Sequence, residues 1–345
     1  MQQSQEQPRR RPMSKIVMLA AAAAIGLSAV PADAQWKPTK PIRIIVPWGA
    51  GGSTDQLART LAVDLEEALG QKVVIVNQPG GAGAVGTKAV LDAPHDGYTW
   101  SAGATKDLGT YVVTGAVNTK LSDWNLYLAN VNFTVLSVHP NSKFKTVDDI
   151  AKAMKSNPAS VTIATGGINS AGGASAEALK AAVGGDYKMV TYDGGNPAVQ
   201  AAVAHETEVT TQLIAEQYEM LRAKKLKPLA AFTSEKVTID GIGELPSIKA
   251  SLPKAQVGPV HFGLFVPKDV PAEVLQTLDK IWDEKIAKSK RLQDYSTSKG
   301  LTTLVMRGQK AYDAAFPVVQ MNAWQIHDGG KSATAPDKVG IPRPN

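Results

Sequence analysis

The sequence predicts an α/β protein of two lobes, each a mainly parallel sheet flanked by helices, with a ligand cleft between the lobes. Short apolar runs typical of buried strands alternate with helical patterns, which favours parallel sheets. Two of the strands, 42–46 and 161–164, lead into a glycine-rich loop and then a helix, which indicates two similar units. With 345 residues, 43% hydrophobic and 20% charged, the chain is long enough for two domains and a sizeable core.

The first unit begins with the strand over 42–46 and a helix that starts at Ser53. Gln56 stands three residues later as a capping-box partner. Leucines then recur every four residues as far as Leu69 and give the helix one apolar face, and Gly70 ends it. The other elements expected in this unit are strands over 73–76 and 98–102 and a short helix over 87–92.

The second unit repeats this order of elements. Thr146 is expected to cap one helix, and the helix after the second glycine-rich loop is expected to end at Gly184 and Gly185. Asn196 followed by Pro197 predicts another helix start, with a side-chain cap before a proline in the first helical position. The strands expected here cover 133–138, 161–164, 189–192 and 228–232.

The chain then returns to the first unit. A strand over 261–266 and a helix over 271–289 are followed by a helix over 309–327, in which Pro317 is expected to cause a kink or a break. Residues 331–345 are expected to form a loose, proline-rich tail. With crossings placed near 137 and 258, the predicted lobes are 35–136 plus 259–345 and 137–258.

Residues 1–34 carry the pattern of a secretory signal peptide. Arg9, Arg10, Arg11 and Lys15 precede an apolar run, which ends at an Ala-x-Ala cleavage pattern over 32–34. A membrane anchor is the alternative, but a run of about 15 residues is too short to span a bilayer comfortably. We therefore expect a periplasmic protein whose mature chain starts near Gln35 and is not membrane-embedded.

Composition excludes several classes of function. The net charge is +6, or 33 minus 29 (+4) without the signal peptide, which is too weak and too evenly spread to indicate a nucleic-acid partner. The absence of cysteine excludes thiol catalysis, disulfides and thiolate metal sites. The five histidines show no metal-ligand spacing, and no Gly-x-Ser-x-Gly elbow occurs. The sequence therefore predicts neither an enzyme nor a metal site.

The two glycine-rich loops are candidate anion sites. In the first glycine loop, residues 48–55, the backbone N–H groups of Gly51 and Gly52 and the hydroxyl of Ser53 stand at a helix start. In the second glycine loop, residues 165–170, Gly167 would supply a further N–H group. A plain tight turn is the alternative for the first loop. Asp55 would repel a carboxylate, so it is expected to cap the helix or to bind a ligand ammonium group.

The segment Gly81–Gly86 matches the dinucleotide pattern G-x-G-x-x-G, and Asp107 follows at a suitable distance. Four residues, Asn77 to Gly80, separate the strand from the first glycine, so the required tight turn is missing. An exported protein also has little access to nicotinamide cofactors. We expect a glycine-rich connection beside the cleft, and no cofactor.

Trp48 is expected to face the cleft, because open α/β sheets place ligands at the carboxyl ends of their strands; a purely core position is the alternative. A ligand with an aromatic or long apolar body could stack on it. The complete set of predicted ligand-binding residues is Trp48, Gly51, Gly52, Ser53, Thr54, Asp55, Thr105, Thr165, Gly167, Asn169, Ser170, Tyr192, Gln212 and Phe262.

Several segments carry a family likeness. They are Lys40–Pro47 with Gly51–Asp55, Gly70–Gly80, Asp96–Thr99 and Phe262–Pro267. Together they resemble the receptors of tripartite tricarboxylate transporters, the Bug family of periplasmic solute-binding proteins. The likeness is strong over 40–99, moderate over 261–290 and loose between.

This resemblance implies a hinged, monomeric periplasmic binding protein that delivers its ligand to membrane permease subunits. It also implies that the two glycine loops hold one ligand carboxylate, partly through waters. Less constant residues, here assigned to Thr105, Tyr192, Gln212 and Phe262, would read the other end of the ligand. The sequence departs from the family at Asp193, where a lysine is usual, so the ligand of a better-known member is not carried over.

Two other functions stay open at this point. The same fold could serve a ligand-sensing protein whose closed form acts on a sensor kinase. An exported hydrolase is the third candidate, although the sequence offers no evident nucleophile, base or metal. The leading interpretation is a receptor for a small carboxylate, with dicarboxylates and aromatic acids as the candidates.

Overall fold

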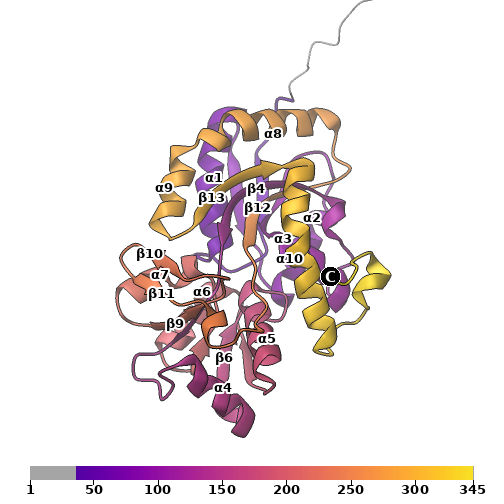
Figure 1. Cartoon of the computed structure of the whole chain (residues 1–345). Helices are drawn as coiled ribbons and strands as arrows, with labels where there is room; N and C mark the ends of the chain where they lie inside the picture. Colours follow the sequence, from indigo (N-terminus) through magenta and orange to yellow (C-terminus); the bar gives the residue numbers. More distant parts are fainter. Residues whose placement is uncertain (1–35, 345) are drawn as a thin grey trace, which may run out of the picture. The chain divides into compact units, whose positions relative to one another are not determined.

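Two sheets, each flanked by helices, make up the part of the chain that the computed structural model describes, residues 36–344 (Figure 1). The signal peptide expected over residues 1–34 lies outside the described residues. The two-sheet α/β architecture confirms the predicted fold class, but both sheets are mixed and not mainly parallel as expected, because the strands that follow the crossings and the strand Thr302–Arg307 pair antiparallel. No helix in the described part is both long and apolar enough to cross a bilayer.

The first sheet and its helices are called lobe 1. Its strands are β1 (Ile42–Val46), β2 (Val73–Asn77), β3 (Thr99–Ala104), β4 (Trp124–Asn132), β12 (Val260–Pro267) and β13 (Thr302–Arg307), in the spatial order β13-β4-β12-β3-β1-β2. Its helices are α1 (Ser53–Leu69), α2 (Ala84–Leu91), α3 (Thr105–Thr114), α8 (Ala272–Glu284), α9 (Lys290–Ser298) and α10 (Gly308–Asp328).

The second sheet and its helices are called lobe 2. Its strands are β5 (Val135–Val138), β6 (Thr162–Thr165), β7 (Lys188–Thr191), β8 (Val209–Thr210) and β9 (Lys227–Ala231), in the order β7-β6-β8-β5-β9. Its helices are α4 (Val147–Ser156), α5 (Ala171–Val183), α6 (Gly195–Val203) and α7 (Ile214–Arg222). A separate hairpin consists of β10 (Val237–Ile239) and β11 (Gly243–Leu245).

The chain crosses between the lobes twice, and each crossing leads into an antiparallel strand. β5 runs antiparallel to β8 and β9, and β12 runs antiparallel to β3 and β4. The strands that precede the glycine loops instead pair in parallel: β1 with β2 and β3, and β6 with β7 and β8. The first crossing covers residues 133–134, between β4 and β5. The predicted lobe limits near 137 and 258 remain predictions.

Helix α1 shows how local sequence sets an element. Leu57, Leu61 and Leu65 are almost completely buried and pack in the core of lobe 1. Gly70 follows in the left-handed conformation with φ of 66° and donates its N–H to the Glu66 carbonyl, which ends the helix. The apolar spacing and the stop residue predicted both features correctly.

Three expectations for the lobe 1 elements are wrong. The helix expected over 271–289 ends earlier, because α8 stops at Glu284 and a short 3-10 turn over Ile286–Lys288 follows it. Strands β4 and β13 and helices α3 and α9 were not expected. Pro317 does not break α10: it lies on the exposed face, while the opposite face packs on α3 so closely that Gly109 leaves no room for a side chain beside Val319.

The C-terminal segment is not loose. Ala333 donates its N–H to the Val113 carbonyl at 2.8 Å, and the Ile341 side chain is buried. The Trp324 indole donates to the Ile341 carbonyl at 3.1 Å. The C-terminal segment is therefore hydrogen-bonded to α3 and α10, whereas its proline content had predicted a loose tail.

Candidate functional site

A small cavity of about 20 Å³ lies where loops from both lobes meet. This volume accommodates about one water molecule, far less than the several hundred Å³ of an ordinary ligand pocket. The lobes are therefore closed on each other, and a larger solute enters only when they separate. The lining residues are Trp48, Gly52, Ser53, Thr54, Ala104, Asp107, Ser170, Ala171, Gly195, Gln212, Leu213, Glu216 and Phe262.

The cavity brings together half of the predicted set. Predicted residues that line it are Trp48, Gly52, Ser53, Thr54, Ser170, Gln212 and Phe262. Predicted residues outside its lining are Gly51, Asp55, Thr105, Thr165, Gly167, Asn169 and Tyr192. Trp48 combines the two positions considered for it: its side chain lines the cavity and also packs in the core of lobe 1.

The first glycine loop leads from β1 into α1. Gly52, and not Ser53, is the N-cap residue, and it offers no side chain to the free N–H groups of the helix start. The Gly51 N–H, one residue before the N-cap, donates to Asp55 Oδ2 at 2.9 Å, so Asp55 fastens the loop to the first turn of the helix. Burial works to raise the pKa of Asp55, but Arg59 and the Gly51 N–H hold it below its ordinary value.

A free donor of α1 is satisfied from the other lobe. The Ser53 N–H donates to Oε1 of Glu216 at 3.2 Å, and Glu216 stands in the first turn of α7 in lobe 2. Burial raises the pKa of Glu216 to about 7, against the opposing effect of the Ser53 N–H. A carboxylate thus occupies the start of α1, which is the place the sequence assigned to a ligand.

Glu216 was not among the predicted site residues. The sequence signal that could have found it is its place in the first turn of a helix that begins four residues after β8, with Gln212 between them. With its amide oriented by the hydrogen bonds open to it, Gln212 donates from Nε2 to Glu216 Oε2 at 3.2 Å. Its oxygen accepts from the Gly166 N–H at 2.9 Å. Gln212 therefore links the second glycine loop to Glu216.

Apart from the Gly166 N–H, which donates to Gln212, the second glycine loop pairs several of its donors with its own acceptors. The Ser170 hydroxyl accepts from the Gly173 N–H at 3.0 Å and donates to the Gly167 carbonyl at 2.8 Å. The Thr165 hydroxyl accepts from the Gly167 N–H at 3.0 Å. Ser170 is the N-cap of α5, so this helix start is complete without a partner from lobe 1.

A buried ion pair lies beside the cavity. Lys106 Nζ lies 2.8 Å from Asp107 Oδ1, and both side chains, at the start of α3, are almost completely buried. Lys106 also donates to the backbone carbonyl of Asn169 in the second glycine loop. Burial raises the pKa of Asp107, although Lys106 opposes the rise. The one cation in this region is therefore paired within the protein.

Two of the predicted residues outside the cavity lining, Thr105 and Tyr192, lie in different lobes. Thr105 is buried and donates to the His261 carbonyl at 3.5 Å, at the base of β12. Tyr192 follows β7 in lobe 2 and is partly exposed. Asn196, expected as a cap, stands inside α6, whose N-cap is Gly194. Glycine takes that cap because the chain there passes against Gly49 of lobe 1, whose N–H donates to the Asp193 carbonyl at 2.9 Å.

Contacts between the lobes continue along α10. Gln325 donates from its amide to the Ala174 carbonyl at 2.8 Å. Lys331, just after α10, lies 2.5 Å from Glu177, a buried carboxylate of α5 that also accepts from the Tyr187 hydroxyl. The closed arrangement is therefore held at the loops and along this helix.

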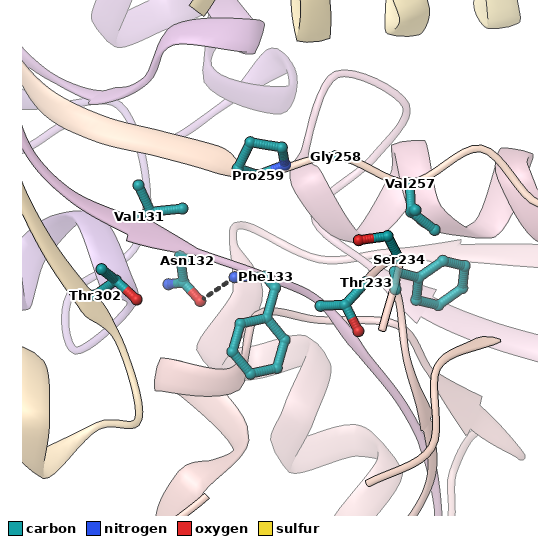
Figure 2. Close-up of a pocket in the computed structure, with 10 residues that line it drawn as sticks. Val131, Asn132, Phe133, Thr233, Ser234, Val257, Gly258, Pro259 and Thr302 are labelled. Carbon is teal, nitrogen blue, oxygen red and sulfur yellow. Dashed lines mark hydrogen bonds between the residues drawn. The ribbon is translucent and has the colours of Figure 1, made fainter. Parts of the chain in front are cut away.

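A larger cavity of about 250 Å³ lies at the crossing segments (Figure 2). Residues 131–133 at the end of β4 and 257–259 before β12 form two of its walls, together with 232–234 and Thr302. Figure 2 shows Asn132 turned back to the backbone, where it accepts from the Phe133 N–H at 2.9 Å. No charged side chain is among the described residues of this wall, so it offers a carboxylate no counter-charge.

Comparison with known proteins agrees with this architecture. Protein BugT of Bordetella pertussis is 27% identical over 286 residues, which cover 80% of this chain and 85% of that protein. The structure of the periplasmic binding protein BugD superposes with a TM-score of 0.77 at 21% identity, over 86% of this chain and 99% of BugD. MatC from Rhodopseudomonas palustris with bound malate gives 0.74 at 23% identity, over 84% of this chain and 98% of MatC.

At these identities the two structures establish the fold, which this chain shares with BugD and MatC. The family follows from the sequence itself. The model of the tripartite tricarboxylate transporter family receptor matches residues 57–321, most of the chain. Since that stretch includes most of α1, both crossings and the second glycine loop, the predicted resemblance is confirmed, and the chain belongs to the tripartite tricarboxylate transporter receptor family.

Proposed function

We propose that this protein is a periplasmic receptor that captures a small carboxylate between its lobes and delivers it to the membrane permease subunits of a tripartite transporter. The observation that carries the proposal is the meeting of both glycine loops at one cavity, with a carboxylate already bound to the start of α1. That contact supports the proposal, because a backbone N–H at this helix start donates to a carboxylate without an arginine or a metal.

Two further points support a receptor. MatC, a structural neighbour, holds malate, and malate is a small dicarboxylate. No histidine is among the described residues that line the cavity, so Ser53 has no general base of that type beside it, which disfavours the hydrolase alternative. The segments at both crossings have the position of a hinge, and hinge closure would bring the loops together around a solute.

The test is a binding screen of the mature chain from Gln35. Acetate, succinate, malate, adipate and benzoate are titrated by calorimetry, each beside its uncharged methyl ester. We expect at least one acid to bind with a dissociation constant of about 1 μM, and to stabilise the fold by about 2.7 kcal/mol at 100 times that concentration. Esters are expected not to bind, because they lack the charge that the α1 start attracts.

A pair of tryptophan variants tells cleft binding from general stability. Trp48→Phe removes aromatic surface from the cavity wall, whereas Trp100→Phe removes the same atoms from the buried core of lobe 1. We expect about three- to tenfold weaker binding for the first variant alone, from lost stacking. Binding that is weakened equally by both, or by neither, would contradict a ligand at this cavity.

A further inference from the structure

The side chain of Glu216 occupies the donors that a carboxylate solute would use. One carboxylate oxygen accepts from the Ser53 N–H of lobe 1, and the other lies 3.2 Å from the Gln212 amide of lobe 2. A carboxylate of a solute bound between the lobes would need donors of this kind from both sides. Glu216 therefore has the place and the partners of a bound ligand group.

The backbone around this carboxylate is shaped to admit it. A side chain at Gly195, the first residue of α6, would overlap both oxygens of Glu216. On the opposite side, a Cβ atom at Gly52 would lie 3.4 Å from Oε1. The carboxylate thus lies between two glycines, one from each lobe, and Gly195 is a position that any larger residue would close.

The start of α7 is tied to the first crossing. The Ile214 N–H donates to the Phe133 carbonyl, and the Val135 N–H donates to the Gln212 carbonyl, both at 2.9 Å. Movement at the crossing residues 133–134 is therefore passed directly to the segment that carries Gln212 and Glu216. This places Glu216 where it can leave Ser53 as the lobes separate.

The charges that face Glu216 leave it without a cation of its own. Asp107 at the start of α3 is paired with Lys106, and Asp55 in α1 is paired with Arg59. Tyr295 of α9 has a buried hydroxyl with no hydrogen-bond partner, and its pKa is raised by burial and by the charges of Glu216 and Asp55. A second carboxylate brought beside an ionised Glu216 would therefore meet repulsion that no free cation in the described wall offsets.

We propose that Glu216 is an internal stand-in for the ligand: its carboxylate keeps the empty receptor closed, and a carboxylate solute binds by replacing it at the Ser53 N–H and the Gln212 amide. This inference rests on the proposed function. It adds which donors hold the solute carboxylate and which side chain of the protein competes for them. It also makes binding proton-linked, because a neutral Glu216 gives up the position more readily than an ionised one.

The expected pH effect follows from the raised pKa of Glu216, about 7 in the closed protein. If a carboxylate binds only when Glu216 is neutral, about one molecule in ten is competent at about pH 8 and nearly all are competent at about pH 5.5. The dissociation constant of the wild type for the acids of the panel is thus expected to fall about tenfold between these two conditions.

Two variants test the shared position in different ways. Glu216→Ala deletes the competing carboxylate, whereas Gly195→Ala fills the place that any carboxylate at these donors would occupy. Glu216→Ala is expected to bind the acids about tenfold more tightly than the wild type at about pH 8 and to lose most of the pH dependence, and Gly195→Ala is expected to bind them about tenfold more weakly or worse at both pH values. Glu219→Ala, which removes an exposed carboxylate from the same helix, is the matched control and is expected to bind like the wild type.

The outcomes separate the two proposals. Equal binding by wild type, Glu216→Ala and Gly195→Ala at both pH values would overturn the stand-in while leaving the receptor intact. Weaker binding by Glu216→Ala would overturn it too, since Glu216 would then be a residue that holds the ligand. No binding of any acid to any of the three would overturn both. Should Glu216→Ala not fold, the wild-type pH profile and Gly195→Ala still decide.

Discussion

The two glycine loops have similar sequences and opposite solutions to the same problem. Both follow a parallel strand and both open a helix whose first N–H groups need acceptors. The second loop provides an acceptor itself, because the Ser170 hydroxyl accepts from the Gly173 N–H in the first turn of α5. The first has glycine at its N-cap and takes an acceptor for the Ser53 N–H from Glu216 in the other lobe.

This difference indicates a division of labour between the lobes. A helix start that caps itself is a rigid, finished element, because its donors have no need of an external group. A helix start that borrows a carboxylate accepts one group in exchange for another. Under the proposed function, lobe 1 would contribute the exchangeable anion site and the second loop would contribute a fixed wall beside it.

The largest expected effect tests the rigidity of the second loop. Gly173→Ala would force a side chain into the Gly167 carbonyl, whereas Gly52→Ala in the first loop makes only ordinary contacts. We expect about 3 kcal/mol or more lost from the free energy of unfolding in the first variant, and about 1 kcal/mol or less in the second. Urea titrations of both variants measure this, and similar losses would remove the contrast between the loops.

The next effect concerns the borrowed carboxylate. The pKa of Glu216 is about 7 in the folded protein and 4.5 ordinarily, so the folded state keeps a proton that the unfolded state releases. Stability is therefore expected to decrease as the pH rises from about 5 to about 8, by about 1–3 kcal/mol given partial exposure. Denaturant midpoints across this range measure it, with Glu216→Gln as the control that removes the decrease.

The smallest effect compares the two helix-start serines. Ser170→Ala removes the cap of α5 and is expected to cost about 1–2 kcal/mol. Ser53→Ala removes a hydroxyl that caps nothing: it accepts from Asn132 at 3.4 Å, and it opposes the rise in the pKa of Glu216. This substitution is expected to cost about 0.5 kcal/mol or less. Melting temperatures measured side by side decide whether the serines differ in this order.

The parts of the fold that sequence predicts are those set by neighbours along the chain. Strand β1, the length of α1 and its stop at Gly70, and the Thr146 cap of α4 all follow from local spacing. Glu216 could not be found in this way, because its partner Ser53 lies 163 residues away. The Lys106–Asp107 pair also depends on tertiary burial, since adjacent charges ordinarily indicate a solvated surface.

The ion pair between Lys331 and Glu177 shows where the contact between α10 and α5 can be used to measure the separation of the lobes. The natural chain has no cysteine, so two introduced cysteines, one on the outer face of α10 and one on that of α5, would be the only sites for thiol-reactive labels. Spin labels at these two sites would allow the distance between α10 and α5 to be measured directly by dipolar spectroscopy. The distribution of label-to-label distances would then show how the populations with lobes in contact and lobes apart change in solution as solute or acid is added.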